Sequence, residues 1–296
     1  MSENEDRISR NRVDIYGISQ KFSNYNYLIN GNFMINQRNK STYSSSTSKY
    51  VYTVDRWRFN KISNTTCTKL DTGVRISSSV YESGVVFGQI LENPSLFSGK
   101  QMTFSLKYEN LQGAVSIGIY DGEKALYSES TEKKEDSIKI TKLIAEDCKS
   151  IICVINKQNE EDFSIDLLEA KLEIGMTATP FIPRLYAEEL ALCQRYFYGN
   201  IFYQGGAVAA STGSSLYAYL SLPVAMRTTP TITYDSATVV RGYGKNIAHS
   251  VVSSITVPGT YDNQLRLLVT LSSNNMTTNQ IYAFANGRGT FDAEIY

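Results

Sequence analysis

The sequence has few of the residues on which metal and catalytic sites depend. It contains one histidine, one tryptophan and four cysteines among 296 residues. The separations of Cys67, Cys148, Cys153 and Cys193 fit neither a zinc ribbon nor a Cys-x-x-Cys redox motif, and one histidine does not complete a Cys/His cluster. We therefore assign no metal ligand and no cofactor, although the carboxylates of Asp55, Asp71 and Glu173 leave a calcium ion in the sandwich open. We interpret Cys153, in an apolar run, as a buried and inert thiol.

Net charge and long apolar runs are also missing. Lys plus Arg equals Asp plus Glu at 29 each, so no basic excess favours nucleic acid or an anionic membrane. No apolar run reaches the length of about 20 residues that a membrane-spanning helix needs. Residues 1–12 are polar and mixed in charge, unlike a secretory signal. We expect a protein without a nucleic-acid partner or membrane insertion, which is intracellular or released without the usual export route.

Motifs of nucleotide and acyl-transfer chemistry are absent too. Gly242-x-Gly244 is followed by no helical pattern, which indicates a turn, and no Walker motif or dinucleotide fingerprint occurs. His249 has no nucleophile elbow or oxyanion motif beside it, so we assign no catalytic residue. Glycoside hydrolysis needs two carboxyl groups about 5–10 Å apart. Glu169 and Glu173 share a strand face, but a β-protein of this size supplies such pairs by chance.

Tyrosine is the abundant residue, with 21 Tyr against 12 Phe. Its flat apolar face and polar tip suit wet recognition surfaces, and tyrosine also suits antiparallel sheets, so the abundance fits both interpretations. Hydrophobic residues make up 42% and charged residues 20%, which excludes a wholly disordered chain. The length allows two domains with separate cores.

The region from about residue 27 to residue 183 predicts one strand after another. Residues 102–108 and 114–120 alternate apolar and polar side chains, which is the pattern of half-buried strands. Further strands are predicted at 138–140 and 151–155. Short strands separated by turns favour a β-sandwich over an α/β fold.

Two local features modify this pattern. Residues 163–167 alternate in one phase and residues 168–174 in the opposite phase, which predicts a β-bulge or bend at Leu167-Leu168. Lys40–Lys49 is nearly all Ser, Thr and Tyr, and we predict a mobile surface loop there.

A short helix is predicted to begin near Leu185, after the prolines that end the first β-region. Its apolar stripe either caps its own sandwich or packs on copies of itself in a three-helix junction, and the periodicity favours neither. The stripe consists of Tyr186, Leu190, Cys193 and Phe197. Residues 199–296 predict a second all-β domain, because 216–222 and 265–271 alternate and turn residues such as Pro258-Gly259 separate the strands.

Two pairs of phrases resemble the segments that open and close a β-sandwich module in tail-fibre and receptor-binding proteins of bacteriophages and phage-derived tail particles. The opening phrases are Asn30–Phe33 and Thr53–Trp57, and the closing phrases are Leu172–Phe181 and Glu188–Tyr196. The module is similar to a carbohydrate-binding jelly roll. The resemblance covers about residues 28–196, and segments 222–231 and 291–294 resemble such proteins more loosely.

This resemblance implies an all-β protein with two β-sandwich, jelly-roll-like domains joined by a short helix. The expected parts are an N-terminal attachment segment (1–26), a carbohydrate-binding-module-like sandwich (27–183), a linker helix (184–198) and a C-terminal sandwich head (199–296). It also implies a homotrimer that is bound to a neighbouring tail or baseplate protein through the N-terminal segment. The location would be a virion tail, made in the host cytoplasm and released on lysis.

The function that the resemblance implies is attachment of the tail to a host cell-surface polysaccharide without catalysis. The alternatives are a glycan-degrading tail enzyme and a purely structural tail adaptor. Trp57 is an aromatic candidate for sugar contact, but its position in an opening phrase favours a core or strand-pairing role. Loops of the C-terminal domain are the better candidates, and the predicted ligand-binding residues are Arg241, Tyr243, Asn246, His249, Tyr261, Asp262 and Asn263.

Overall fold

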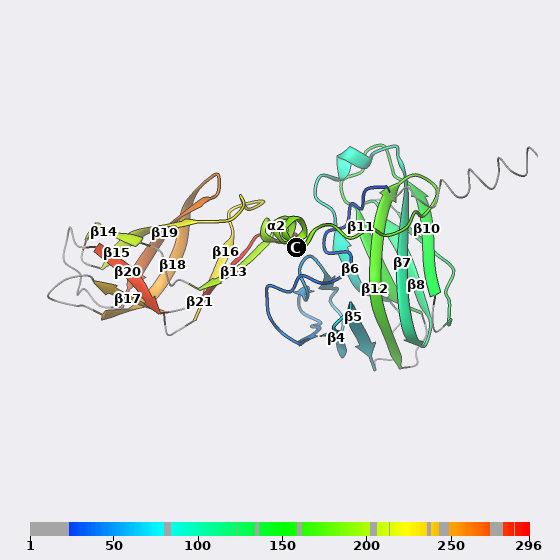
Figure 1. The fold of residues 1–296 in the computed structure, drawn as a ribbon, viewed down its shortest axis with the longest axis horizontal. Coiled ribbons are helices and arrows are strands. Elements are labelled where there is room, and N and C mark those ends of the chain that lie inside the picture. The colour runs from blue at the N-terminus through cyan, green and yellow to red at the C-terminus, as the bar shows by residue number, and fades with distance from the viewer. Residues whose placement is uncertain are drawn as a thin grey trace, which may run out of the picture. The chain divides into compact units, whose positions relative to one another are not determined.

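The protein is built almost entirely from antiparallel strands, in two compact units (Figure 1). The first unit extends to Leu185 and the second covers Tyr186–Tyr296. The computed structural model describes residues 24–79, 84–122, 124–133, 136–158, 162–201, 206–212, 214–235, 238–242, 249–272, 281–286 and 288–296. The predicted attachment segment therefore lies almost wholly outside the described residues. The predicted all-β class is confirmed.

The first unit, here the sandwich unit, consists of two six-stranded sheets. The β12 sheet has the order β1-β4-β5-β12-β7-β10, and the β11 sheet has the order β2-β3-β6-β11-β8-β9. Its elements are β1 (Thr42–Ser44), β2 (Val51–Tyr52), β3 (Arg58–Phe59), β4 (Thr65–Lys69), β5 (Val74–Ser78), β6 (Gly84–Ile90), η1 (Pro94–Phe97), β7 (Gln101–Gln112), β8 (Val115–Tyr120), β9 (Ala125–Tyr127), β10 (Asp136–Leu143), β11 (Ile152–Lys157) and β12 (Phe163–Ile174). Figure 1 shows β12, β7 and β10 side by side in one layer.

One hydrophobic core lies between the two sheets. Alternate residues of β7 and β8 enter it, including Phe104 and Leu106 from β7 and Ile117 and Ile119 from β8. The period-two patterns in the sequence therefore identified the buried faces of these strands correctly. The intervening residues of each strand lie on the outer face of a sheet, where binding residues have to be sought.

The change of phase at Leu167-Leu168 is a β-bulge, as predicted. The register between β12 and β7 shifts between Leu167 and Glu169, within a single twelve-residue strand. The extra residue restores the facing of both halves, so that Leu167 and Leu172 are both buried in the core.

The prediction of a mobile loop at Lys40–Lys49 was wrong for its central part. Residues 42–44 form β1, which pairs antiparallel with β4, and Tyr43 is buried in the core. The Tyr43 hydroxyl donates to Asn36 Oδ1. Burial raises the pKa of Tyr43 to about 12. A single buried aromatic ring orders this polar segment, because the ring supplies the apolar contact that its neighbours lack.

Asp121 ties the turn after β8 to the turn after β10. Its carboxylate accepts hydrogen bonds from the backbone N–H groups of Lys124 and Ala145, each at 3.1 Å, and forms an ion pair with Lys142 Nζ at 2.7 Å. Burial raises the pKa of the Asp121 carboxyl, but Lys142 and the two backbone donors outweigh this effect and hold the pKa at about 2. The ionised carboxylate is therefore the form that the fold stabilises.

We expect Asp121→Asn to cost about 2 kcal/mol of the free energy of unfolding at pH 7. Because the pKa of Asp121 is lower in the folded state, its contribution is complete above an unfolded pKa of about 3.9. That contribution is lost as the pH falls through about 2. Urea denaturation at pH 7, 4.5 and 2.5 should therefore show the wild type and the variant converging. A constant difference across this range would contradict the assignment.

The second unit, here the barrel unit, begins with helix α2 (Tyr186–Gln194). Its strands are β13 (Phe197–Ile201), β14 (Gly206–Thr212), β15 (Ser215–Ser221), β16 (Thr231–Tyr234), β17 (Val239–Gly242), β18 (His249–Tyr261), β19 (Gln264–Leu271), β20 (Ile281–Asn286) and β21 (Arg288–Asp292). Six strands close into a barrel in the order β14-β15-β19-β18-β17-β20, and β13-β21-β16 form a smaller sheet. The alternating residues of β15 and β19 fill the barrel core, as their patterns predicted.

Helix α2 packs against its own unit. Cys193 is buried, whereas Tyr186 is exposed, and Phe197 lies in β13 rather than in the helix. Glu189, which was not predicted to be buried, is 6% exposed. Among the described residues, no helix has the length and apolar character of a membrane span.

Candidate functional site

The structure separates the predicted ligand-binding residues into two groups. Arg241 pairs with His249 at one end of the β17–β18 hairpin, and Tyr261 pairs with Gln264 at the opposite end of β18. Strand β18 has 13 residues, so the two groups lie at opposite ends of a strand that is at most about 40 Å long at about 3.3 Å per residue. They do not form one site.

The structure describes the side chains of Asp262 and Asn263 in these two groups. Tyr243 and Asn246 lie outside the described residues, as do the side chains of Arg241, His249 and Tyr261. Asp262 is exposed, with a positive φ of 49°, as the first residue of the β18–β19 turn. Asn263 accepts through its backbone O from Leu222 N at 2.7 Å and donates from Nδ2 to Leu222 O at 3.1 Å. Asn263 therefore holds the chain that follows β15.

The opening phrases form part of the sandwich core. The Trp57 ring is fully buried, stacks on Phe87 at a centroid distance of 5.4 Å, and donates from Nε1 to Asn30 O at 2.9 Å. The Asn30 amide bonds the backbones of Ile35 and Asp55. The structural role preferred for Trp57 is confirmed, and this ring is not a sugar platform.

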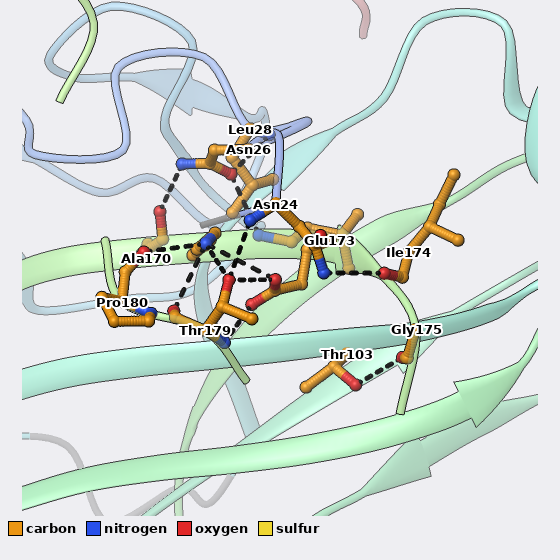
Figure 2. Close-up of polar contacts among 12 residues, drawn as sticks. Asn24, Asn26, Leu28, Thr103, Ala170, Glu173, Ile174, Gly175, Thr179 and Pro180 are labelled. Atoms are coloured by element: carbon orange, nitrogen blue, oxygen red, sulfur yellow. Dashed lines mark hydrogen bonds and ion pairs between the residues drawn. The ribbon is translucent and has the colours of Figure 1, made fainter. Parts of the chain in front are cut away.

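The closing phrases meet the start of the sandwich unit in a network that we call the clasp, formed by residues 24–31 and 170–184 (Figure 2). Asn26 donates from Nδ2 to Ala170 O and accepts at Oδ1 from Leu172 N, each at 3.0 Å. Ala170 N donates to Gly31 O at 2.7 Å. The clasp thus places the chain that enters the sandwich beside residues 170–172 of β12, beyond the part of β12 that pairs with β5.

Gly31 is required at its position in the clasp. A Cβ atom there would lie 2.4 Å from Ala170 O and 2.7 Å from Asn26 Nδ2. Both contacts are shorter than real Cβ contacts, and one of them is to backbone. The glycine in the opening phrase is therefore explained by the close approach of two chain segments.

A buried ion pair lies at the centre of the clasp. Lys171 Nζ is 3.4 Å from Glu173 Oε2 and donates to Thr179 Oγ1 at 2.6 Å and to Pro180 O at 2.9 Å. Thr179 donates to both Glu173 oxygens, from N at 2.8 Å and from Oγ1 at 2.5 Å. Burial lowers the pKa of Lys171, and the charge of Glu173 opposes this effect. Glu173 is 0% exposed, so the clasp encloses it and no substrate reaches it.

The other acidic residues of β12 are also held by partners. Asp166 accepts two hydrogen bonds from Arg75, at 2.6 and 2.7 Å, and one from Asn110 at 2.9 Å. Burial raises the pKa of Asp166, but the Arg75 hydrogen bond outweighs it and the pKa is lowered. Glu169 lies 3.7 Å from Lys107 on the surface. A general acid needs a raised pKa, and this row of carboxyl groups does not supply one at Asp166.

All four cysteines are buried, and none of them forms a disulfide bond. Burial raises the pKa of Cys67 to about 12, and burial also raises the pKa of Cys153 and of Cys148. Such thiols are poorly ionised and are weak nucleophiles at neutral pH. Among the residues that the structure describes, no group of three or more His, Cys, Asp or Glu side chains is arranged to hold a metal ion.

The outer face of the β11 sheet carries an aromatic ring beside a polar cluster, and we call it the Tyr127 face. Tyr127 pairs with Gly118, and a Cβ at Gly118 would lie 2.4 Å from the Tyr127 ring. The ring therefore occupies the space above the glycine, yet Tyr127 remains 45% exposed. Only glycine at position 118 allows the ring to lie against the sheet.

Three hydrogen-bonding side chains complete the Tyr127 face. Ser116 lies two residues from Gly118 on β8 and pairs with Asn156 of β11, so both side chains lie on the outer face. Gln158 is exposed and donates from Nε2 to Ser116 Oγ at 2.7 Å. Asn156 is 3% exposed, and its Oδ1 has no hydrogen-bond partner among the described residues. Ser116 is 1% exposed, so of these three side chains the exposed Gln158 amide is the one that reaches the surface, on the face that carries the Tyr127 ring. An exposed ring together with an amide held by a buried hydroxyl is a composition that suits a sugar-binding surface.

One signal of the Tyr127 face is visible in the sequence alone. Gly118 lies between Ile117 and Ile119 in the interior of a predicted strand, and a glycine at such a position often marks the close approach of another group. The group that approaches is Tyr127, and the pairing of β8 with β9 was needed to identify it.

Comparisons with known proteins give only distant structural matches. No protein-family model matches the sequence, and no curated protein matches it. Among solved structures, the CBM22-1–GH10 modules of Clostridium thermocellum endo-1,4-β-D-xylanase 10B, complexed with xylohexaose, align at 11% identity and a TM-score of 0.30 over 54% of this chain. This chain spans 30% of that structure. The tandem CBM22-1–CBM22-2 domain of Paenibacillus barcinonensis Xyn10C aligns at 9% identity and a TM-score of 0.32 over 93% of this chain and 98% of that one.

Proposed function

We propose that this protein is a non-catalytic, glycan-binding component of a phage or phage-like tail, which attaches the particle to a host cell-surface polysaccharide. The observation that carries the glycan-binding part is the Tyr127 face, where an exposed ring lies against Gly118 on the same face as Ser116, which holds the exposed Gln158 amide. The tail assignment rests on the resemblance of the opening and closing phrases. The protein would be located in the virion tail, made in the host cytoplasm and released on lysis.

The Tyr127 face suits a polysaccharide for two chemical reasons. The ring offers its apolar face to the C–H face of a sugar ring, which is the part of a sugar that water solvates least. The exposed Gln158 amide offers a donor and an acceptor to sugar hydroxyls, and the buried Ser116 hydroxyl holds that amide in place. Contacts of this kind are weak individually and gain strength from repetition in the particle.

A homotrimer is part of the proposal. Ile182, Leu185 and Tyr186 are each more than half exposed, close together along the chain. Exposed apolar groups of this size are typical of interaction sites. Three copies would present three sugar sites to one surface, and the N-terminal segment would bind the neighbouring tail or baseplate protein.

The alternative of a glycan-degrading enzyme receives less support from the arrangement of carboxyl groups. Glu173 is enclosed by the clasp, and Asp166 is held ionised by Arg75. The adaptor alternative differs by predicting no envelope binding at all. Both alternatives are separated from the proposal by one assay, in which protein-stripped host envelopes are incubated with the full chain and the supernatant is tested for new reducing ends.

Tyr127→Ala is expected to weaken envelope binding about ten-fold, because an anchoring tyrosine typically contributes about 1–2 kcal/mol. Co-sedimentation of the full chain with protein-stripped envelopes measures the effect. Leu126→Ala is the matched control, since Leu126 is the neighbouring residue of β9, is similarly exposed, and alternates to the other side of the strand. Equal binding by both variants would remove the Tyr127 face from the proposal. Release of sugar would place the protein among the enzymes instead.

A further inference from the structure

The outer face of the barrel unit holds an arginine stacked on a tyrosine. The Arg266 guanidinium carbon lies 4.1 Å from the centroid of the Tyr217 ring. Arg266 also pairs directly with Tyr219 across the β15–β19 ladder, and Tyr219 is 49% exposed. Their neighbours along each strand, such as Leu267 and Ala218, are buried in the barrel core. The three side chains therefore share the outer surface.

The charge of Arg266 is not neutralised within its unit. The acidic residues of the barrel unit are Glu188, Glu189, Asp235, Asp262, Asp292 and Glu294. None of them forms an ion pair with Arg266 in the described part of the chain, and Arg266 Nε is buried without a hydrogen-bond partner. On its other side Arg266 faces Gly259 of β18, which has no side chain to offer. A guanidinium without an acidic partner, stacked on the half-buried Tyr217 ring and next to the exposed Tyr219 ring, has the composition of a recognition group.

We propose that Tyr217, Tyr219 and Arg266 form a binding site for an anionic sugar unit, in which Arg266 receives a carboxylate or phosphate group. This inference rests on the proposed glycan-binding function and adds the chemical class of one bound group. Stacking on Tyr217 fixes the plane of the guanidinium, so that its parallel N–H groups are directed as a fork that matches two oxygens of one oxyanion. The Tyr219 ring then supplies an apolar surface for the sugar that carries the anion.

The site lies apart from the residues first expected to bind ligand. Arg266 is on β19, three residues beyond Asn263, whereas the predicted residues lie in the turns at the two ends of β18. Strand faces hold side chains more rigidly than loop tips, which favours a preorganised site. The chemistry of Arg266 is compatible with uronic-acid carboxylates and with polyol-phosphate chains, and both sources are compared in the test.

The test measures binding of the full chain to three immobilised polymers: polygalacturonate, poly(glycerol phosphate) and neutral dextran. We expect the wild type to bind at least one of the anionic polymers more tightly than dextran. Arg266→Gln should bind that polymer at least about ten-fold more weakly, because a charge-assisted hydrogen bond typically contributes about 1.5–3 kcal/mol. Arg266→Lys should recover only part of the loss, since lysine keeps the charge but not the fork.

Arg288→Gln is the matched control, because it removes the same charge from an exposed position on β21 and should leave binding unchanged. Tyr217→Phe should keep binding and Tyr217→Leu should lose it, which tests the stacking even if one variant folds poorly. Binding of neither anionic polymer, or equal binding by Arg266→Gln and Arg288→Gln, would overturn the proposal. Tyr127 and Arg266 lie in different units. A negative result in the Tyr127 test therefore does not affect the interpretation of the Arg266 test, and a negative result in the Arg266 test does not affect that of the Tyr127 test.

Discussion

Replacing Glu173 by glutamine is expected to lower the free energy of unfolding of the sandwich unit by about 3–5 kcal/mol at pH 7. The substitution keeps the size of the side chain but leaves Lys171, which is 3% exposed in its side chain, without its counter-charge. An uncompensated buried ammonium is far more costly than a lost surface contact. Urea denaturation followed by tryptophan fluorescence measures the loss, since the single tryptophan, Trp57, reports on this unit alone.

The same strand provides a matched control for this prediction. Glu169→Gln makes the same chemical change four residues earlier on β12, where Glu169 forms a surface ion pair with Lys107. It should lower the free energy of unfolding by no more than about 1 kcal/mol. A double variant, Lys171→Met with Glu173→Leu, should recover most of the stability, because neither charge then remains buried. If Glu173→Gln were as mild as Glu169→Gln, the clasp would not depend on its ion pair.

Trp57→Ala is expected to destabilise the sandwich unit by about 3–5 kcal/mol, the usual cost of removing a buried aromatic ring. The ring touches Phe33 and Phe87, at centroid distances of 4.8 and 5.4 Å, and its removal opens a cavity that these neighbours cannot fill. Trp57→Phe keeps a ring in place and loses the Nε1 hydrogen bond to Asn30 O, so about 1 kcal/mol should be lost. Circular dichroism follows both variants, since neither contains tryptophan.

The Trp57→Phe variant also separates a core role from a ligand role. A buried ring has no access to sugar, so envelope binding by the folded variant should equal that of the wild type. Loss of binding with unchanged stability would contradict the assignment of Trp57 to the core and would reopen the opening phrases as a binding surface.

The fold was predictable where the local sequence alone determines which side chains of a strand point into the core. The alternation in β7, β8 and β19 identified the buried faces, and the change of phase at Leu167-Leu168 identified the bulge in β12. Strand β1 was missed because its order depends on one buried ring, Tyr43, among polar residues that favour a loop. The local sequence shows the alternation of a strand, but it does not show which other part of the chain will pack against that strand and bury it.

The binding surfaces were not predictable for a related reason. Pro258-Gly259 was interpreted as a gap between strands, but it lies inside β18 at a shift of register. This error hid the length of β18, which separates the two predicted groups of ligand residues. The Tyr127 face and the Arg266 pair depend on cross-strand neighbours, Gly118 and Tyr219, that only the assembled sheets bring opposite them.

The clasp has a consequence for the order in which the protein is made. Asn26 forms hydrogen bonds with Ala170 and Leu172, which are separated from it by 144 and 146 positions in the sequence. Arg184 donates a hydrogen bond to the backbone oxygen of Leu28. On the ribosome, the sandwich unit therefore cannot complete its hydrogen bonding until about residue 184 has emerged, by which time synthesis of the barrel unit has begun. Closing so long a loop is slow, so the nascent sandwich will stay open to chaperones and proteases for most of its own translation.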